Sequence, residues 1–522
     1  MFAPMPRAGT GVGRAAALLT VLASASAVLG FGRDVVVAAV FGAGAELDAF
    51  LVAQGMMNLV LGLVSSAVAT ALVPVIAREA TGEDGVRRAN HTVTVALSVT
   101  LVVLGLASVV LFLFAGPAVS ALAPGFDDEQ AELAVRTTRI VLVAVVLVSG
   151  TNLLAAAAQA RRRFFWAGVQ GIPFNITMIV AAVGFGPTYG ITALAVGFVV
   201  GSALRLACQL VPLRAIGLRL RFSFDLTDPG FRAIARLTPA LLVGSGIGNV
   251  NTLVDRAVAS VVGEGVITSL SYGWRLVTLP ETLVIASLVA ALYPAFGASA
   301  ARRSELRRLV GRGLSSATIV ALPVCVLLLV AAHPLVTLAF GHGSFDADAV
   351  DDTATAVRWY APALIAMSWR EVVVKASYAL GDSRTPVLVA LAAMCVNVAG
   401  DLTVGLSFGV AGLAASTSAA MCLAAAANTW LLARRHGGVS IRPLAGLVGR
   451  TTVAAGAATL AGIVAVYALG LRLGEGQGAA IAQVTLAALS VWAVFVLVLR
   501  ALRAAEVEVI RDALALIRRR RG

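Results

Sequence analysis

Charged residues inside long apolar segments are the first feature of the sequence that points to chemistry. Arg33 and Asp34 stand side by side after Gly30 and Gly32, and Arg275 lies in a second apolar segment. A charge in the bilayer interior is costly unless it faces a cavity or a partner. Guanidinium groups in a hydrated cavity bind phosphate oxygens well. The arginines therefore predict an anion site, and a neutralised Arg33–Asp34 pair at the membrane interface is the alternative.

A second polar group consists of oxygen-bearing side chains. Asn397 and Asp401 are four residues apart in one apolar segment, so their side chains project from one face of a helix. Asp255 and Thr417, in two other apolar segments, are further oxygen donors. Such donors suit a small hard cation. Spacing alone leaves open an Asp401 that is simply solvated near a helix end.

Constellations for catalysis or ATP use are missing from the sequence. The four histidines are isolated, the four cysteines have no ligand spacing, and the chain has neither a nucleophile–base pair nor a Walker sequence. We predict a protein that is not an enzyme, has no tightly bound cofactor and draws any energy coupling from ions rather than ATP.

The composition places the chain in a membrane. Of 522 residues, 59% are hydrophobic and 13% are charged, whereas soluble domains have about a quarter charged residues. Apolar runs recur at the length of roughly 20 residues that a helix needs to cross the hydrocarbon, and none alternates as barrel strands do. The net charge of +13 does not indicate nucleic-acid binding, because the basic residues form short clusters between apolar runs.

The apolar runs predict an all-α integral membrane protein with about fourteen transmembrane helices. The first run follows Arg7 and Arg14 and also fits a signal peptide, but its continuation through Leu29 and Phe31 favours a retained helix. The expected helices, with ends uncertain by several residues, are 15–40, 48–76, 91–115, 139–158, 166–185, 190–213, 238–262, 271–296, 314–332, 359–380, 385–404, 409–433, 448–470 and 478–500.

Arginine-rich loops alternate with arginine-poor or acidic loops along this series. Because short arginine-rich loops stay in the cytoplasm, both termini are predicted inside and the loop 263–270 outside. The basic tail 500–522 fits a surface helix on anionic lipid and equally a solvated positive tail.

An ordered set of short motifs resembles the MurJ/MviN family, the lipid II flippases of the multidrug/oligosaccharidyl-lipid/polysaccharide superfamily. The matching stretches run in family order from the first to the twelfth expected helix. They are Leu29-Gly30-Phe31-Gly32-Arg33-Asp34, Phe41-Gly42-Ala43-Gly44, Asp48-Ala49-Phe50, Tyr272-Gly273-Trp274-Arg275-Leu276, Leu279-Pro280, Tyr293-Pro294, Phe340-Gly341-His342-Gly343-Ser344-Phe345, Tyr378-Ala379-Leu380-Gly381-Asp382 and Arg384-Thr385-Pro386-Val387.

The resemblance implies two six-helix lobes around a cationic central cavity, in residues 1–237 and 238–437. Residues 438–522 would add two helices that form a groove for a lipid tail, and the basic tail. It also implies a flippase that carries lipid II from the cytoplasmic to the outer face of the plasma membrane. Cell-wall synthesis or division proteins are candidate partners beside the lipid-linked precursor and membrane lipids, and no nucleic acid is expected.

The resemblance assigns roles to individual residues as well. Matched by motif, the substrate-binding residues are Arg33, Asp34, Asp48, Asn175 and Arg275. Asp255, Asn397, Asp401 and Thr417 match a sodium site that some family members have.

Three departures from the family pattern affect the expected anion site. Ala27 stands where an arginine is usual, Met57-Asn58-Leu59-Val60-Leu61-Gly62 lacks the family's basic and acidic residues, and Trp274 replaces an acidic residue. They favour, as the runner-up, a flippase for another polyprenyl-linked oligosaccharide of the O-antigen or exopolysaccharide type. A drug antiporter should instead have acidic cavity walls. A membrane scaffold for wall synthesis that transports nothing is the alternative from another class, and it would not need Arg33 or Arg275.

Overall fold

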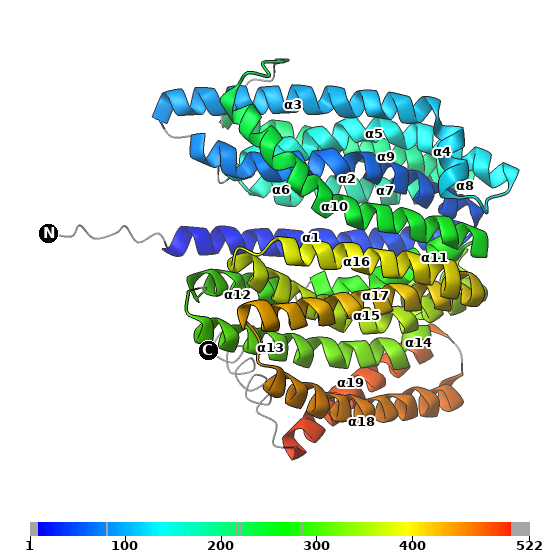
Figure 1. The fold of residues 1–522 in the computed structure, drawn as a ribbon. Coiled ribbons are helices and arrows are strands. Elements are labelled where there is room, and N and C mark those ends of the chain that lie inside the picture. Colours follow the sequence, from blue (N-terminus) through cyan, green and yellow to red (C-terminus); the bar gives the residue numbers. More distant parts are fainter. Residues whose placement is uncertain are drawn as a thin grey trace. The chain divides into compact units, whose positions relative to one another are not determined.

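A computed structural model describes residues 9–79, 82–161, 163–215, 217–218, 221–282, 286–299, 301–474 and 476–502. These residues form helices, turns and short connections, with no strand among them. The chain divides into two compact units, Met1–Glu264 and Gly265–Gly522 (Figure 1). Most of the basic tail predicted to lie on the lipid surface falls outside the described residues.

Unit 1 is a bundle in which α2 packs against α5 and α10, and α9 packs against α5 and α7. Leu72, Val93 and Leu153 bring α2, α3 and α5 together in a buried apolar cluster. The helices of this unit are α1 (Gly9–Phe41), α2 (Ala45–Glu79), α3 (Gly82–Leu113), α4 (Ala115–Leu122), α5 (Asp128–Ala160), α6 (Phe165–Val169), α7 (Gly171–Val180), the π-helix η1 (Ala181–Phe185), α8 (Gly186–Tyr189), α9 (Ile191–Ala215) and α10 (Pro229–Val262).

Unit 2 is built around α15, which packs against α11, α13 and α17. The last two helices, α18 and α19, pair with each other and pack on α13 through Val326, Ala458 and Phe495. The helices of this unit are α11 (Val266–Pro280), α12 (Ala286–Ser299), α13 (Arg303–Val330), α14 (Ala332–Ala339), α15 (Ala347–Ala379), α16 (Arg384–Gly400), the π-helix η3 (Asp401–Gly405), α17 (Leu406–His436), α18 (Ile441–Leu473) and α19 (Gln477–Ala501).

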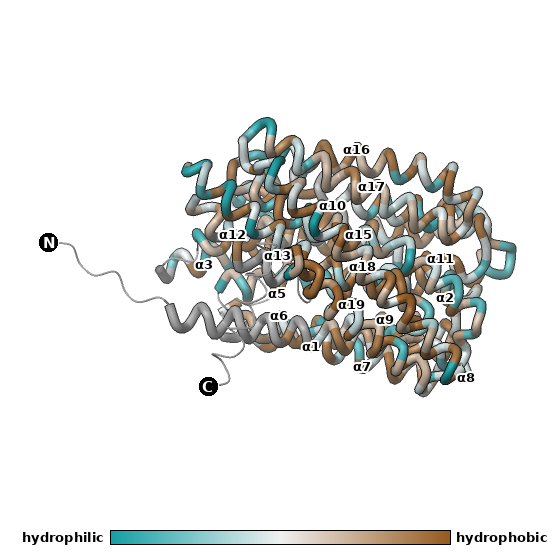
Figure 2. Tube along the Cα trace, turned by 90° about the horizontal axis from the view of Figure 1, so that it is seen from below, coloured by the Kyte–Doolittle hydropathy of each residue, from teal (hydrophilic) through white to brown (hydrophobic). Residues whose placement is uncertain are grey.

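The all-α membrane class is confirmed, and each expected apolar segment overlaps a helix or a chain of consecutive helices. Figure 2 shows hydrophobic residues along most of the helix lengths and hydrophilic residues mainly near their ends. Within the described residues, eight helices are long and apolar enough to span a membrane, and a ninth is added if the bent α2 counts as one span. The count of fourteen stays a prediction.

Small residues allow close packing between these helices. Lipid tails give apolar side chains little reason to associate, so membrane helices pack best where glycine and alanine let the backbones approach. A Cβ atom at Gly412 of α17 would collide with the backbone oxygen of Val404 in η3, and one at Gly400 would lie 2.7 Å from the Ser416 hydroxyl oxygen. Glycine is therefore required where α16 and α17 meet.

A wide π-turn followed by a positive-φ glycine occurs at matching places in the two units. In unit 1, η1 precedes Gly190, with φ of +56°, and in unit 2, η3 precedes Gly409, with φ of +59°. Glycine adopts positive φ without the steric cost that other residues meet. The following residues are also similar, Gly-Ile-Thr-Ala-Leu-Ala from 190 and Gly-Val-Ala-Gly-Leu-Ala from 409. The two units thus share one helix–π-turn–helix arrangement.

The division between the compact units falls after α10, because α10 packs on α2, α3 and α4. The sequence placed α10 in the second transport lobe. The lobes 1–237 and 238–437 and the tail segment 438–522 remain a proposal.

Candidate functional site

Arg33 and Asp34 form an ion pair on α1. The Nη2 and Nε atoms of Arg33 donate to Oδ1 of Asp34 at 2.6 and 3.0 Å. The side chains are 19% and 14% exposed, respectively. Charge-assisted bonds of this kind fix the direction of a guanidinium group. Since that group has five N–H donors, the pair leaves donors on Arg33 for a ligand.

The ring of Phe174 joins three helices of unit 1. The Cζ atoms of Arg33 on α1 and Arg205 on α9 lie 5.7 and 5.2 Å from its centroid. A cation at this range is attracted by the electrons of the ring face. Phe174 is 6% exposed, and a Cβ at Gly201 of α9 would lie 2.9 Å from the ring. The buried ring therefore holds two arginines beside each other.

Polar atoms without hydrogen-bond partners lie on the same helices. Asn175 of α7 has its Nδ2 atom 3.5 Å from the Ser26 carbonyl oxygen, whereas its buried Oδ1 has no partner within the described residues. Gln209, one turn after Arg205, donates from Nε2 to the Trp166 carbonyl at 2.8 Å. Its Oε1 atom and the Nε atom of Arg205 likewise lack partners in the described part of the chain.

Asp48 lies in the first turn of α2 and is fully buried. Arg256 of α10 interacts electrostatically with it and donates from Nη1 to the Leu51 carbonyl. Gly55 makes room for this guanidinium group, because a Cβ there would collide with Nη1. Asp48 thus belongs to the contact of α2 with α10, and its role in substrate binding remains a prediction.

Arg275 is half-buried on α11, a helix that packs tightly on α15. A Cβ at Gly273 would lie 2.7 Å from a side chain of α15. Trp274 packs edge-on against Tyr360 of α15, with ring centroids 5.1 Å apart. This packing orients the turn that carries Arg275. Because Arg33 lies in unit 1 and Arg275 in unit 2, their joint action also remains a prediction.

The structure brings together two of the four predicted cation ligands. Asn397 donates from Nδ2 to Oδ2 of Asp401 at 2.8 Å, and the residues are 2% and 0% exposed. Thr417 is 8% exposed and donates its hydroxyl to the Leu413 carbonyl at 3.2 Å. The hydroxyl oxygen keeps its lone pairs free to coordinate a cation. Asp255 lies in unit 1.

These oxygen atoms fit sodium better than a transition metal. No group of three or more histidine, cysteine or acidic residues able to hold a metal occurs among the described residues. Carboxylate, amide and hydroxyl oxygens are ligands for hard cations. A Cβ at Gly400 would lie 2.7 Å from the Ser416 hydroxyl oxygen. The turn that carries Asp401, next to Gly400, therefore packs against the turn of α17 that carries Thr417. Asp255 accepts from Asn251 at 3.2 Å.

Comparison with known proteins decides the family. The family model described as lipid II flippase MurJ matches residues 37–486, which is most of the chain. The chain belongs to the MurJ family. The resemblance inferred from the ordered motifs is therefore confirmed.

Individual relatives agree with the MurJ assignment. The lipid II flippase MurJ of Burkholderia cenocepacia is 29% identical over 423 residues, which cover 78% of this chain and 81% of that protein. A solved structure of lipid II flippase MurJ in an inward closed conformation matches with a TM-score of 0.78 at 20% identity, covering 93% of this chain and 99% of its own. An inward-facing multidrug resistance MATE transporter has a TM-score of 0.64 at 17% identity, and the match covers 81% of this chain and 95% of the transporter. The structural matches show the fold that MurJ shares with MATE transporters.

Membership of the MurJ family confirms that the protein is a membrane transporter and not an enzyme. Arg205 was missed in the sequence, although it is an arginine within the apolar segment 190–213. The rule applied to Arg33, that a charge within a membrane helix marks a functional position, would have found it.

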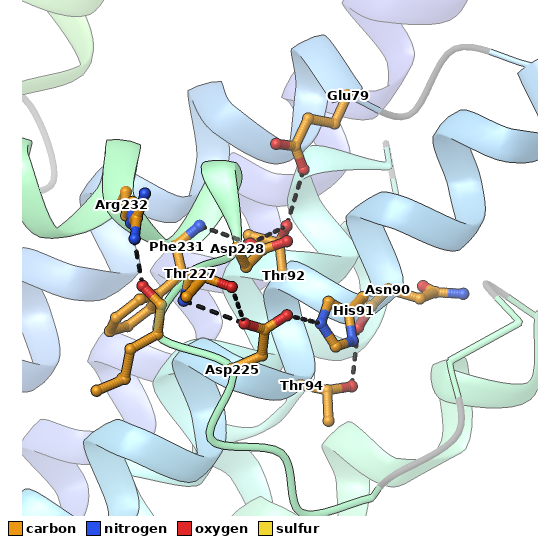
Figure 3. Close-up of polar contacts among 11 residues, drawn as sticks. Glu79, Asn90, His91, Thr92, Thr94, Asp225, Thr227, Asp228, Phe231 and Arg232 are labelled. Carbon is orange, nitrogen blue, oxygen red and sulfur yellow. Dashed lines mark hydrogen bonds and ion pairs between the residues drawn. The ribbon is translucent and has the colours of Figure 1, made fainter.

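The connection between α9 and α10 is fixed to the helix ends of unit 1 by polar contacts (Figure 3). The Thr92 hydroxyl lies 2.8 Å from Oδ2 of Asp228 and 3.1 Å from Oε2 of Glu79. His91 Nε2 lies 3.1 Å from Oδ2 of Asp225. Asp228 also caps α10 by accepting from an N–H of its first turn. These contacts hold the connection on α2 and α3 and position α10.

A comparable cluster holds the turn between α15 and α16 in unit 2. Asp382 accepts from the Thr385 backbone N–H at 3.0 Å and from the Thr385 hydroxyl at 2.7 Å, and His436 Nε2 lies 2.9 Å away. Burial opposes ionisation of Asp382, but these hydrogen bonds and the charge of His436 outweigh it and lower the pKa of Asp382 to about 2. The folded protein thus favours the ionised carboxylate.

We predict that Asp382→Asn lowers the melting temperature by a pH-dependent amount. A carboxyl group whose pKa falls from about 4 on folding stabilises the native state above that pH and loses the effect as the pH falls toward its native pKa. The difference between parent and variant should be present above about pH 4 and shrink as the pH falls below that value. A difference that stays the same down to about pH 2 would contradict the charge-based explanation.

Proposed function

We propose that the protein is a lipid II flippase that moves the precursor from the cytoplasmic to the outer face of the plasma membrane. The observation that carries the proposal is the MurJ family match across residues 37–486. The relative from Burkholderia cenocepacia, which covers most of the chain, is named lipid II flippase MurJ. The arginines of the membrane helices supply the chemistry that a pyrophosphate-linked cargo needs.

In the proposed mechanism, Arg33 and Arg275 bind the pyrophosphate, and Asp34 holds Arg33 in the direction that its ion pair fixes. Asn175 would offer its amide oxygen to the sugar head. The helices α18 and α19 would accommodate the polyprenyl tail, and several side chains of α18, including Leu460, Val464 and Tyr467, are largely exposed. Exposed apolar side chains on a membrane helix suit contact with lipid.

The test of the proposed function is complementation of a bacterial strain depleted of its own lipid II flippase. Expression of this protein should restore growth and cell shape, and purified protein should flip lipid II in vesicles. A protein that flips another polyprenyl-linked oligosaccharide but not lipid II would identify the runner-up cargo. A membrane scaffold would flip neither lipid.

We further propose that sodium binds at Asn397, Asp401 and Thr417, with Asp255 as a fourth ligand, and couples to transport. Asp401 is fully buried, and its carboxylate, the Asn397 amide and the Thr417 hydroxyl are oxygen ligands of the kind that a hard cation prefers. When bound, sodium would offset the charge of the carboxylate. Asn397 orients the carboxylate through its 2.8 Å hydrogen bond. A proton shared between carboxylates is the competing explanation.

Sodium should therefore raise the melting temperature of the purified protein relative to potassium at equal ionic strength and pH. An ion that binds only the folded state stabilises it by mass action, by about 2.7 kcal/mol at a hundred times its dissociation constant. Asp401→Asn should remove the sodium effect, whereas Asp382→Asn, at the α15–α16 turn, should keep it. Identical melting curves in sodium and potassium for the parent protein would refute the sodium site.

The family and the apolar helices show a multi-pass membrane protein. We propose that both termini lie in the cytoplasm, because the arginine-rich connections then face inward. Cell-wall synthesis or division proteins are the partners that we expect beside the lipid substrate and membrane lipids.

A further inference from the structure

We propose that Arg205, together with Arg33 and Phe174, forms a phosphate-binding subsite inside unit 1, between α1, α7 and α9. Its ligand is the glycosyl pyrophosphate head of a polyprenyl-linked substrate. The proposal rests on the proposed function, since flipping requires this head to enter the protein. It adds a residue to the substrate-binding site that the sequence motifs do not assign.

The first argument is the local charge. Two guanidinium groups contact the Phe174 ring, and one carboxylate, Asp34, pairs with Arg33. Arg205 is only partly exposed, yet it has no carboxylate partner among the described residues. Like charges repel strongly where the dielectric is low. The surplus positive charge is therefore best offset by a bound anion.

The second argument is the geometry around Phe174. The aromatic ring attracts both cations but carries no net charge, so it orients them without neutralising them. Both Cζ atoms lie within 6 Å of one centroid, and Gly201 lets α9 approach the ring. A pyrophosphate presents several oxygens to two such groups at once, and guanidinium binds phosphate in a bidentate manner.

The third argument distinguishes a glycosyl phosphate from a simple anion. Arg205 Nε is a donor without an acceptor, whereas Asn175 Oδ1 and Gln209 Oε1 are acceptors without donors in the part of the chain that the structure describes. Buried polar groups are normally paired. A ligand that carries phosphate oxygens together with sugar hydroxyl or amide N–H groups would satisfy both kinds. Inorganic phosphate carries few O–H donors, whereas a sugar head carries several hydroxyl and amide N–H groups.

The experiment measures binding of polyprenyl pyrophosphate, and of the uncharged polyprenol, to the purified full-length protein in nanodiscs. Arg205→Gln should weaken polyprenyl pyrophosphate binding by about tenfold or more, as expected for a lost charge-assisted hydrogen bond, and leave polyprenol binding unchanged. Arg205→Lys should retain part of the affinity. Arg139→Gln is the matched control, because Arg139 lies over a single ring, Phe112, at 5.4 Å, and its loss should change neither affinity.

Equal affinity of the parent and Arg205→Gln for polyprenyl pyrophosphate would overturn the subsite, even if the parent flips lipid II. Conversely, a parent that cannot flip lipid II but binds polyprenyl pyrophosphate through Arg205 would refute the proposed function and keep the subsite. The two failures are therefore distinguishable.

A second variant covers the case in which Arg205→Gln does not fold. Asn175→Asp keeps the side-chain shape and adds a negative charge at the residue next to Phe174 in sequence, which should offset part of the surplus positive charge of this part of unit 1. We expect it to weaken polyprenyl pyrophosphate binding by a similar factor and not to lower the melting temperature. Unchanged binding by folded Asn175→Asp would count against the subsite in the same way.

Discussion

Arg33→Ala should insert into the membrane at normal levels and fail to flip lipid II, and Arg275→Ala should fail in the same way. A hydrogen bond to a charged group contributes about 1.5–3 kcal/mol, and each 1.4 kcal/mol is a factor of about ten. Each variant should thus lose about one to two orders of magnitude or more in flipping rate, measured with lipid II in reconstituted vesicles. Lysine at either position should rescue only in part, because it cannot bind phosphate in a bidentate manner.

The control for these variants is Arg139→Ala, which removes an exposed arginine from α5. It should flip at the parental rate. Full activity of Arg275→Ala in vesicles would remove Arg275 from the substrate site. Loss of membrane insertion by Arg33→Ala would instead assign the Arg33–Asp34 pair a structural role.

A cysteine at Ser344 should react with a membrane-impermeant maleimide on intact cells, whereas one at Ser304 should react only after permeabilisation. Ser344 lies in the connection between α14 and α15, which the arginine pattern places outside, and Ser304 begins α13 after an arginine-rich connection. Both side chains are exposed. On intact cells we expect nearly complete labelling at position 344 and almost none at position 304.

Ser344 is a better site for the outside label than Gly265 in the predicted outer loop 263–270. Gly265 has φ of +77°, and a cysteine there would be strained. The labelling needs a background without the four native cysteines, since Cys395 and Cys422 are exposed on the helices. Reaction at Ser304 and not at Ser344 on intact cells would invert the proposed orientation.

The sequence predicted the helices well because each apolar segment carries its own signal. A run of about twenty apolar residues implies a spanning helix whatever its neighbours are. The pairing of Asn397 with Asp401 was also predictable, because residues four apart share a helical face. The family motifs placed the arginines, and the family comparison confirmed that resemblance.

Contacts between segments far apart in sequence could not be predicted in this way. Nothing in the stretch around Asp48 shows that it is buried near Arg256, because that contact depends on how α10 crosses α2. The contact of Arg205 with the Phe174 ring likewise depends on how α9 packs against α7 and could not be predicted from the sequence around Arg205. The short helices α4 and α14 were missed because they lie at the ends of the spans and add little to an apolar run.

The π-turn and the positive-φ glycine that follow α7 in unit 1 recur after α16 in unit 2, and this recurrence points to an internal duplication, in which two copies of one supersecondary element kept their backbone and diverged in charge. The first copy begins at η1 with Ala181 and Ala182, whereas the second begins at η3 with Asp401. In the first, the preceding α7 presents Phe174 to two arginines. In the second, the preceding α16 presents Asn397 to a carboxylate. Under the proposals made above, the first copy would place an aromatic ring between two phosphate-binding arginines, and the second would place an amide beside a sodium-binding carboxylate.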